Sequence, residues 1–186
     1  MFPFLKGNHT MKNLKRYGYI RRMDDLGRIM LPKELRQFLA LQECTALEIS
    51  LMDNGIFIEK YQPLKTLESL CEQYLYAFAQ SCNVVAAICC TDHVVASRGI
   101  CLSKDIILSK ELQNIINGFL NYQYSRNMTI SLFDNGKYPI DTVYPIGTKE
   151  NPLGAIVLLH YRNTTAEEKA CAKLIATILT ELITNQ

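Results

Sequence analysis

The sequence predicts an α+β protein made of two domains, residues 13–63 and 64–186, preceded by a mobile N-terminal extension over residues 1–12. Three observations support this fold class. Short strands and tight turns fill the first domain, amphipathic helices alternate with apolar strands in the second, and basic side chains concentrate in the first. A chain of 186 residues is long enough for two small domains.

The first domain is predicted to open with two short strands around a tight turn. The strands cover residues 17–23 and 28–31, and the sequence Asp-Asp-Leu-Gly at 24–27 supplies the turn. Pro32 suits the first position of a helix, because its fixed φ and missing N–H cost nothing there. The short helix that follows has an apolar face at i, i+3 and i+4, formed by Leu35, Phe38 and Leu39.

A β-hairpin is predicted to complete this domain. Its strands cover residues 47–51 and 56–60, and they flank Asp53-Asn54-Gly55, in which Asn-Gly supplies the positive φ angles of a tight turn. About fifty residues in four short strands and one short helix cannot bury enough surface to be stable alone. The hairpins also leave open edges. The domain is therefore expected to fold only as a dimer.

The second domain is predicted from periodicities that follow a boundary near residues 61–63. Amphipathic helices should cover residues 64–80 and the C-terminal segment, where Thr165 and Glu168 have the spacing of a capping box. Another helix should begin at Ser109 or Lys110. The predicted strands cover residues 84–90, 94–97, 128–132, 142–146 and 155–161. This order is typical of a GAF-like α/β sandwich, in which helices pack against an antiparallel sheet.

Charge is distributed unevenly along the chain, although the net charge is only +2. Positions 12 to 36 contain eight basic and three acidic residues, whereas residues 62–186 are nearly neutral. The basic residues are Lys12, Lys15, Arg16, Arg21, Arg22, Arg28, Lys33 and Arg36, and the acidic ones are Asp24, Asp25 and Glu34. A basic patch confined to one small domain indicates nucleic-acid binding, although a solvated charged face is the commoner fate of such a run.

The seven cysteines indicate a reducing cytoplasm. Their number is odd, no signal peptide precedes them, and they form neither a CxxC motif nor a Cys/His pairing at zinc spacing, so no metal site is expected. Adjacent residues of a strand point to opposite faces of a sheet, which favours ordinary core positions for Cys89 and Cys90. No apolar run reaches the roughly 20 residues of a membrane span.

Three segments carry a family resemblance: IRRMDDLGRIMLPKELR at 20–36, LEI at 47–49 and IEKYQP at 58–63. In this order they resemble the swapped-hairpin DNA-binding domain of AbrB-like transcriptional regulators. PIGTKENPLGAIVLLHY at 145–161 and the last helix resemble, more loosely, family members that add a GAF-like domain. The resemblance implies a β-barrel made from the interleaved hairpins of two chains. It also implies a nucleoid-associated regulator of sporulation or stationary-phase genes that binds double-stranded DNA as an obligate homodimer or a homotetramer.

The same resemblance implies the DNA-binding residues. Arg21, Arg22, Arg28 and Arg36 match the arginines that contact DNA in the family, and arginine can bind both guanine edges and phosphates. Lys33 and Lys15 are expected at phosphates. Gln37 replaces an arginine that relatives often carry after Arg36, and it could contact adenine or a phosphate. Asp24 and Asp25 are interpreted as residues that cap backbone N–H groups or orient these arginines, and Gly27 as the residue that permits the bend presenting Arg28.

Two other functions are less well supported by the same sequence. An antitoxin-like protein would bind a toxin partner and its own operator, but the ordered second domain argues against it. An enzyme would need a Cys nucleophile with His160 or His93 as base, but the residues around Cys89 in the sequence do not indicate a catalytic site. No catalytic residue and no cofactor are predicted. An unidentified small-molecule effector of the GAF-like domain is left open. Its candidate residues, for which ordinary surface roles are favoured, are Arg98, Tyr124, Arg126, Asp141 and Tyr144.

Overall fold

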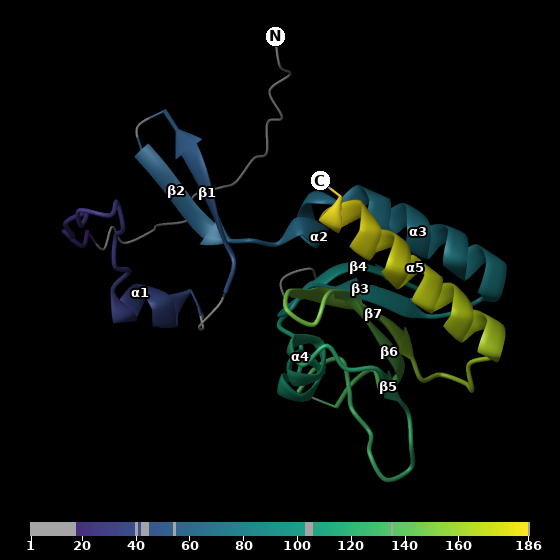
Figure 1. Cartoon of the computed structure of the whole chain (residues 1–186). Coiled ribbons are helices and arrows are strands. Elements are labelled where there is room, and N and C mark those ends of the chain that lie inside the picture. The colour runs from purple at the N-terminus through teal and green to yellow at the C-terminus, as the bar shows by residue number, and fades with distance from the viewer. Residues whose placement is uncertain are drawn as a thin grey trace. The chain divides into compact units, whose positions relative to one another are not determined.

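The computed structural model of the chain divides into two compact units, residues 1–61 (unit 1) and 62–186 (unit 2) (Figure 1). It describes residues 18–39, 41, 45–53, 55–102, 106–134 and 136–185. The expected N-terminal extension, Lys15 and Asn54 of the hairpin turn lie outside these described residues. No helix in the described part of the chain is both long and apolar enough to cross a membrane.

Unit 1 contains a helix and a hairpin. The helix α1 spans Lys33–Phe38, and the strands β1 (Leu47–Met52) and β2 (Gly55–Lys60) pair antiparallel, with Leu47 opposite Lys60 and Met52 opposite Gly55. The predicted helix and hairpin are confirmed. Pro32 precedes α1 instead of opening it, because its ψ of 145° is extended.

The strands predicted over residues 17–23 and 28–31 are not formed in this single chain. Residues 18–24 and 28–32 have no strand assignment. The two segments are joined at the turn, where the Asp24 N–H donates to the Arg28 carbonyl at 3.0 Å. A strand exists only where a neighbour completes its hydrogen bonds, and the described residues of one chain do not provide that neighbour.

Unit 2 is a five-stranded antiparallel sheet with helices on both faces. The sheet order is β4-β3-β7-β6-β5. In Figure 1, α3 and α5 lie side by side over one face and α4 covers the other. The elements are α2 (Pro63–Thr66), α3 (Glu68–Cys82), β3 (Ala86–Cys89), β4 (Val94–Arg98), α4 (Lys110–Asn117), β5 (Tyr122–Gln123), β6 (Ile140–Gly147), β7 (Pro152–Leu159) and α5 (Ala166–Thr184).

The sheet separates two hydrophobic cores, because successive residues of a strand face opposite sides. Ile156 and Leu158 of β7 pack with α3 and α5, whereas Val157 packs in the core on the α4 side. Cys90 belongs to the first core and Cys89 to the second. Their placement on opposite faces confirms the interpretation of these cysteines as core residues.

Two elements of unit 2 differ from the prediction. The helix expected over residues 64–80 is interrupted at Leu67, which separates α2 from α3. The strand expected over residues 128–132 is wrong: this segment makes only isolated bridges, and the short strand β5 occupies the sheet edge beside β6. The Tyr122 hydroxyl of β5 donates to the Met128 carbonyl at 2.7 Å, so β5 holds the segment beside the sheet without pairing along its length.

Gly154 allows the helix α2 to dock on the sheet. A Cβ atom at this position would collide with the Cys89 carbonyl oxygen on the neighbouring strand and with the side chain of Leu64 on α2. Leu64 is fully buried. The absence of a side chain at Gly154 therefore fixes the beginning of unit 2 against its sheet.

Arg162 and Glu168 connect the end of α3 to the beginning of α5. Glu168 accepts two hydrogen bonds from the Arg162 guanidinium, at 3.0 and 2.5 Å, and Arg162 also donates to the Cys82 carbonyl at 3.2 Å. The predicted capping box is confirmed, since Thr165 and Glu168 each accept the other's backbone N–H. Arg162 is the main cause that lowers the pKa of Glu168 below its ordinary value of 4.5.

We expect Glu168→Gln to lower the thermal stability of the protein at pH 7. A carboxyl group whose pKa is lower in the folded state stabilises the fold above pH 4.5, and this contribution is lost as the pH falls through the folded-state pKa. The difference in melting temperature between wild type and variant should therefore shrink below pH 4.5. Glu150→Gln removes the same charge at an exposed position and is the matched control. A deficit independent of pH would contradict the assignment.

Candidate nucleic-acid interface

Asp24 organises the tight turn of unit 1 with both of its carboxylate oxygens. Oδ1 accepts the backbone N–H groups of Leu26 at 3.0 Å and Arg28 at 2.7 Å, and Oδ2 accepts Nε of Arg28 at 2.8 Å. These hydrogen bonds, led by the one from the Arg28 backbone, lower the pKa of Asp24. Gly27 adopts a φ of +76°, a conformation that favours glycine. The interpretations of Asp24 and Gly27 from the sequence are confirmed, whereas Asp25 caps no N–H group and orients no arginine among the described residues.

Arg28 is oriented by this turn and remains exposed. Its side chain is 72% exposed, and only Nε contacts Asp24. The two terminal nitrogens of the guanidinium make no hydrogen bond with the described residues. A guanidinium held by Nε and open at its terminal nitrogens can still bind two acceptors side by side, as guanine edges and phosphates require.

The remaining predicted cations of unit 1 are also exposed. Arg21 donates to the Ile20 carbonyl at 2.9 Å, and its guanidinium lies 5.9 Å from the centre of the Tyr19 ring. Arg22 is exposed beside it. These arginines precede the Asp24 turn directly, so the chain presents three guanidinium groups within eight residues.

The helix α1 presents the other predicted contacts. Lys33, Arg36 and Gln37 are exposed, and their i, i+3 and i+4 spacing places them on the same side of the helix. Among the described residues, these side chains share no hydrogen bond or ion pair with the arginines near the turn. One chain therefore presents two separate polar groups, one at the turn and one on α1.

Most of the described apolar side chains of unit 1 are exposed to water. None of its described hydrophobic residues belongs to the buried core. Ile20, Leu51 and Met30 are 91%, 88% and 80% exposed. The other large exposed hydrophobic residues of this unit are Tyr19, Met23, Leu26, Ile29, Phe38, Leu39, Ile49, Met52, Ile56, Phe57 and Tyr61. Exposed apolar surface of this extent is rare on monomeric soluble proteins and is typical of interaction sites.

Cys90 and His93 lie close together, but they are not arranged like a catalytic nucleophile and its base. His93 Nδ1 lies 3.0 Å from Cys90 Sγ and 2.6 Å from Asp92 Oδ1. In a catalytic triad, the nucleophile and the carboxylate engage different nitrogens of the imidazole, whereas here both contact Nδ1. The hydrogen bond to Asp92 is the main cause that raises the pKa of His93 to about 9. Cys89 faces the opposite core, and His160 instead pairs with Asp141.

Asp141 is buried, which corrects its expected role as an ordinary surface residue. Only 5% of it is exposed, and its carboxylate accepts hydrogen bonds from the Thr142 hydroxyl at 2.7 Å and from Thr164, and lies 3.2 Å from His160 Nδ1. Burial by itself raises the pKa of Asp141, but the hydrogen bonds from Thr164 and Thr142 outweigh it and lower the pKa. Asp141 therefore joins β6 to the segment before α5.

Two of the other effector candidates also make defined contacts. The Tyr124 ring stacks on His160 with centroids 4.1 Å apart, and Arg98 lies over the Tyr76 ring of α3 at 4.8 Å. Tyr144 lines a pocket, while Arg126 is exposed. The structure does not gather these residues into one site.

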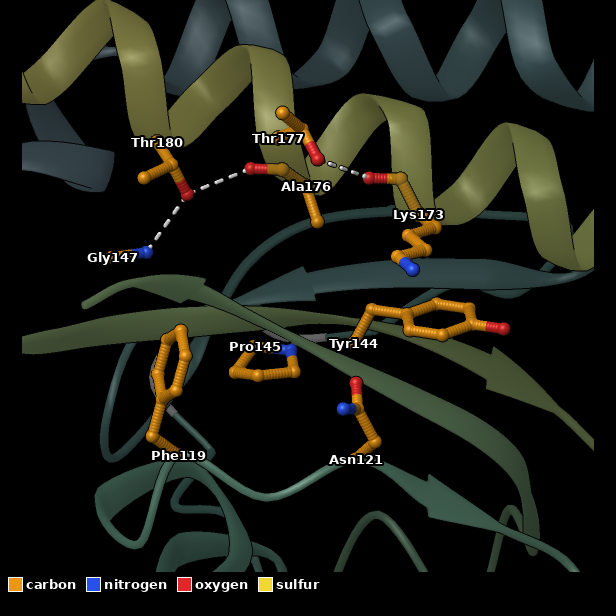
Figure 2. Close-up of a pocket in the computed structure, with 9 residues that line it drawn as sticks. All are labelled: Phe119, Asn121, Tyr144, Pro145, Gly147, Lys173, Ala176, Thr177 and Thr180. Carbon is orange, nitrogen blue, oxygen red and sulfur yellow. Dashed lines mark hydrogen bonds between the residues drawn. The ribbon is translucent and has the colours of Figure 1, made fainter. Parts of the chain in front are cut away.

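The pocket lined by Tyr144 lies between α5 and β6, with the segment after α4 at its edge (Figure 2). It encloses about 250 Å³. Thr180 fixes one wall, because its hydroxyl accepts the Gly147 N–H and donates to the Ala176 carbonyl, both at 2.9 Å. Figure 2 shows Phe119 and Asn121 opposite the helix. The remaining lining residues are Pro145, Lys173 and Thr177.

Comparison with known proteins matches both units to regulators. The model of the family described as stage V sporulation protein T C-terminal, transcription factor, matches residues 66–183. Stage V sporulation protein T of Bacillus subtilis strain 168 is 29% identical over 161 residues, which cover 83% of this chain and 89% of the relative. The transition state regulatory protein AbrB of the same strain is 42% identical over 55 residues, which cover 30% of this chain and 57% of the relative.

Among solved structures, a domain assigned to a two-component sensor histidine kinase protein of Sinorhizobium meliloti 1021 is similar to 64% of this chain. The similarity covers 91% of that domain, with 19% sequence identity and a TM-score of 0.40. A similarity at this level carries no argument about function.

We expect Asp24→Ala to loosen the turn that presents Arg28. The N–H groups of Leu26 and Arg28 would lose the carboxylate that accepts them, so their amide hydrogen exchange should become several-fold faster. Asp25→Ala is the control, because Asp25 has the same charge and makes no hydrogen bond with the described residues. Equal exchange in the two variants would show that Asp24 does not organise the turn.

Proposed function

This chain belongs to the stage V sporulation protein T C-terminal, transcription factor family, and on that basis we propose that it binds double-stranded DNA sequence-specifically through unit 1. The observation that carries the proposal is Arg28, which Asp24 orients while leaving both terminal nitrogens of its guanidinium available. The identity with AbrB, 42% over 55 residues, supports the same proposal.

The exposed side chains of unit 1 have the chemistry that DNA binding requires. Arg21, Arg22, Arg28 and Arg36 can bind guanine O6 and N7 in the major groove or phosphate oxygens. Lys33 suits phosphates, because its ammonium is a flexible point charge. Gln37 can bind adenine through its amide, and Lys15 is proposed as a further phosphate contact by the family resemblance alone.

We propose further that the DNA-binding form is an obligate homodimer, with a homotetramer as an alternative assembly. The exposed apolar residues of unit 1 and the unpaired segments 18–23 and 28–31 are the observations that support it. Interleaving with a second chain would give these segments strand neighbours and remove the apolar side chains from water. It would also place two copies of every arginine on one face.

Unit 2 is proposed to oligomerise and to bind a small-molecule effector, which the pocket between α5 and β6 could hold. The proposed targets are genes of sporulation or stationary phase, as the family suggests, and the proposed location is the nucleoid. The antitoxin alternative is disfavoured, because residues 62–186 form a folded unit where such proteins carry a toxin-binding tail.

We expect Arg28→Ala to weaken DNA binding about 5- to 150-fold, corresponding to roughly 1–3 kcal/mol per dimer. If the wild-type dimer neutralises about six to eight phosphates, the slope of log K against log salt should be roughly −5 to −7, and the variant should lower its magnitude by about 2, one contact per chain. Titration of mixed-sequence duplex DNA at several salt concentrations measures both quantities.

The control for this experiment is Arg126→Ala, which removes the same charge from an exposed position in unit 2. Its affinity and salt slope should match those of the wild type. If Arg28→Ala remains dimeric and binds DNA as tightly as Arg126→Ala does, the proposed interface is incorrect.

The proposed dimer predicts that the structure of unit 1 depends on protein concentration. Amide protection of β1 and β2 should fall as the full-length protein is diluted into its monomeric range, because dissociation leaves the hairpin without a core. Protection of β3 and β7, which lie inside unit 2, should persist and provides an internal control. Hairpin protection that is unchanged where sedimentation shows only monomer would refute an obligate dimer.

A further inference from the structure

The turn between β3 and β4 brings a thiol, an imidazole and a carboxylate together in unit 2. Cys90 Sγ lies 3.0 Å from His93 Nδ1 and 3.2 Å from Asp92 Oδ1, and the last two atoms are 2.6 Å apart. All three atoms lie within 4.8 Å of one another, close enough to serve as ligands of one metal ion. From this juxtaposition we propose that Cys90, Asp92 and His93 form a Zn²⁺ site.

The separations of the donor atoms lie a little below those of a zinc site. Tetrahedral zinc with ordinary bond lengths to sulfur, nitrogen and oxygen would hold its ligand atoms roughly 3.3–3.6 Å apart. The observed separations are shorter, so the pairs must move apart by roughly 0.3 to 0.8 Å to admit the ion. Side-chain rotations of that size are available to Asp92 and His93, whose side chains are 34% and 22% exposed.

The backbone holds the three ligands on one turn. The Cys90 N–H donates to the His93 carbonyl at 3.0 Å, and the Leu108 N–H donates to the Asp92 carbonyl at 2.9 Å. Gln62, the first residue of unit 2, donates its side-chain amide to Asp92 Oδ1 at 3.5 Å. Contacts of this kind fix the orientation of a metal ligand and thereby reduce the entropy lost when the metal binds.

The ligand types favour zinc over the harder cations. A thiolate excludes Mg²⁺ and Ca²⁺, which require oxygen ligands, whereas sulfur, nitrogen and carboxylate oxygen together are ordinary for zinc. Three protein ligands leave a fourth position, which solvent can reach past the partly exposed Asp92 and His93. This proposal is independent of DNA binding, since it concerns unit 2 alone.

The test is metal titration of the full-length, reduced protein. We expect one Zn²⁺ per chain by calorimetry. Co²⁺ as a probe should give a thiolate-to-cobalt charge-transfer band together with the intense visible bands of a tetrahedral site. His93→Ala and Asp92→Asn should each weaken zinc binding at least about tenfold, and Cys90→Ser should remove the charge-transfer band.

Two controls separate this site from the other thiols and from misfolding. Cys101→Ser removes an exposed cysteine and should leave the stoichiometry and the cobalt spectrum unchanged. Circular dichroism should show that His93→Ala, an alteration at a partly exposed position, keeps the fold. Absence of zinc binding, a cobalt spectrum without the thiolate band, or equal losses in Cys101→Ser and His93→Ala would each overturn the proposal and leave a hydrogen-bonded turn.

Discussion

The exposed apolar side chains of unit 1 limit the states in which this protein is stable, because a single chain does not bury them. Residues such as Ile20 and Leu51, 91% and 88% exposed, each forfeit most of the roughly 1.5–3 kcal/mol that complete burial of an aliphatic side chain contributes. The sheet of unit 2 is the opposite case, with a closed core on each face. Unit 2 therefore has what it needs to fold by itself, while unit 1 needs apolar surface from elsewhere.

The DNA-binding proposal follows from the same constraint. A surface made of two short segments around one turn can present cations without a large core, provided that the turn itself is rigid. Asp24 supplies this rigidity by accepting three hydrogen bonds from residues 26 and 28, and it holds the Arg28 guanidinium through Nε alone. The carboxylate therefore positions the guanidinium without occupying the nitrogens that would contact DNA.

Local sequence signals predicted the elements that depend on local interactions. The β1–β2 hairpin, the capping box at Thr165 and the role of Asp24 each depend on residues close together in sequence. The segment 128–132 has strand-forming residues but receives only isolated bridges, and that outcome depends on β5 and β6, which periodicity does not show. The burial of Asp141 is also not evident from the sequence, because its partners His160 and Thr164 are 19 and 23 residues away. The Cys90–His93 pair is local, but its spacing matches no common zinc motif.

The docking of α2 on Gly154 places the first turn of unit 2 against its own sheet. The strand β2 ends at Lys60, Pro63 is already buried, and Leu64 is held fully inside unit 2. Only Tyr61 and Gln62 lie between Lys60 and Pro63 in the sequence. Gly154 therefore sets the residue at which the fold of unit 2 begins, because any larger side chain there would displace Leu64 and expose it to water.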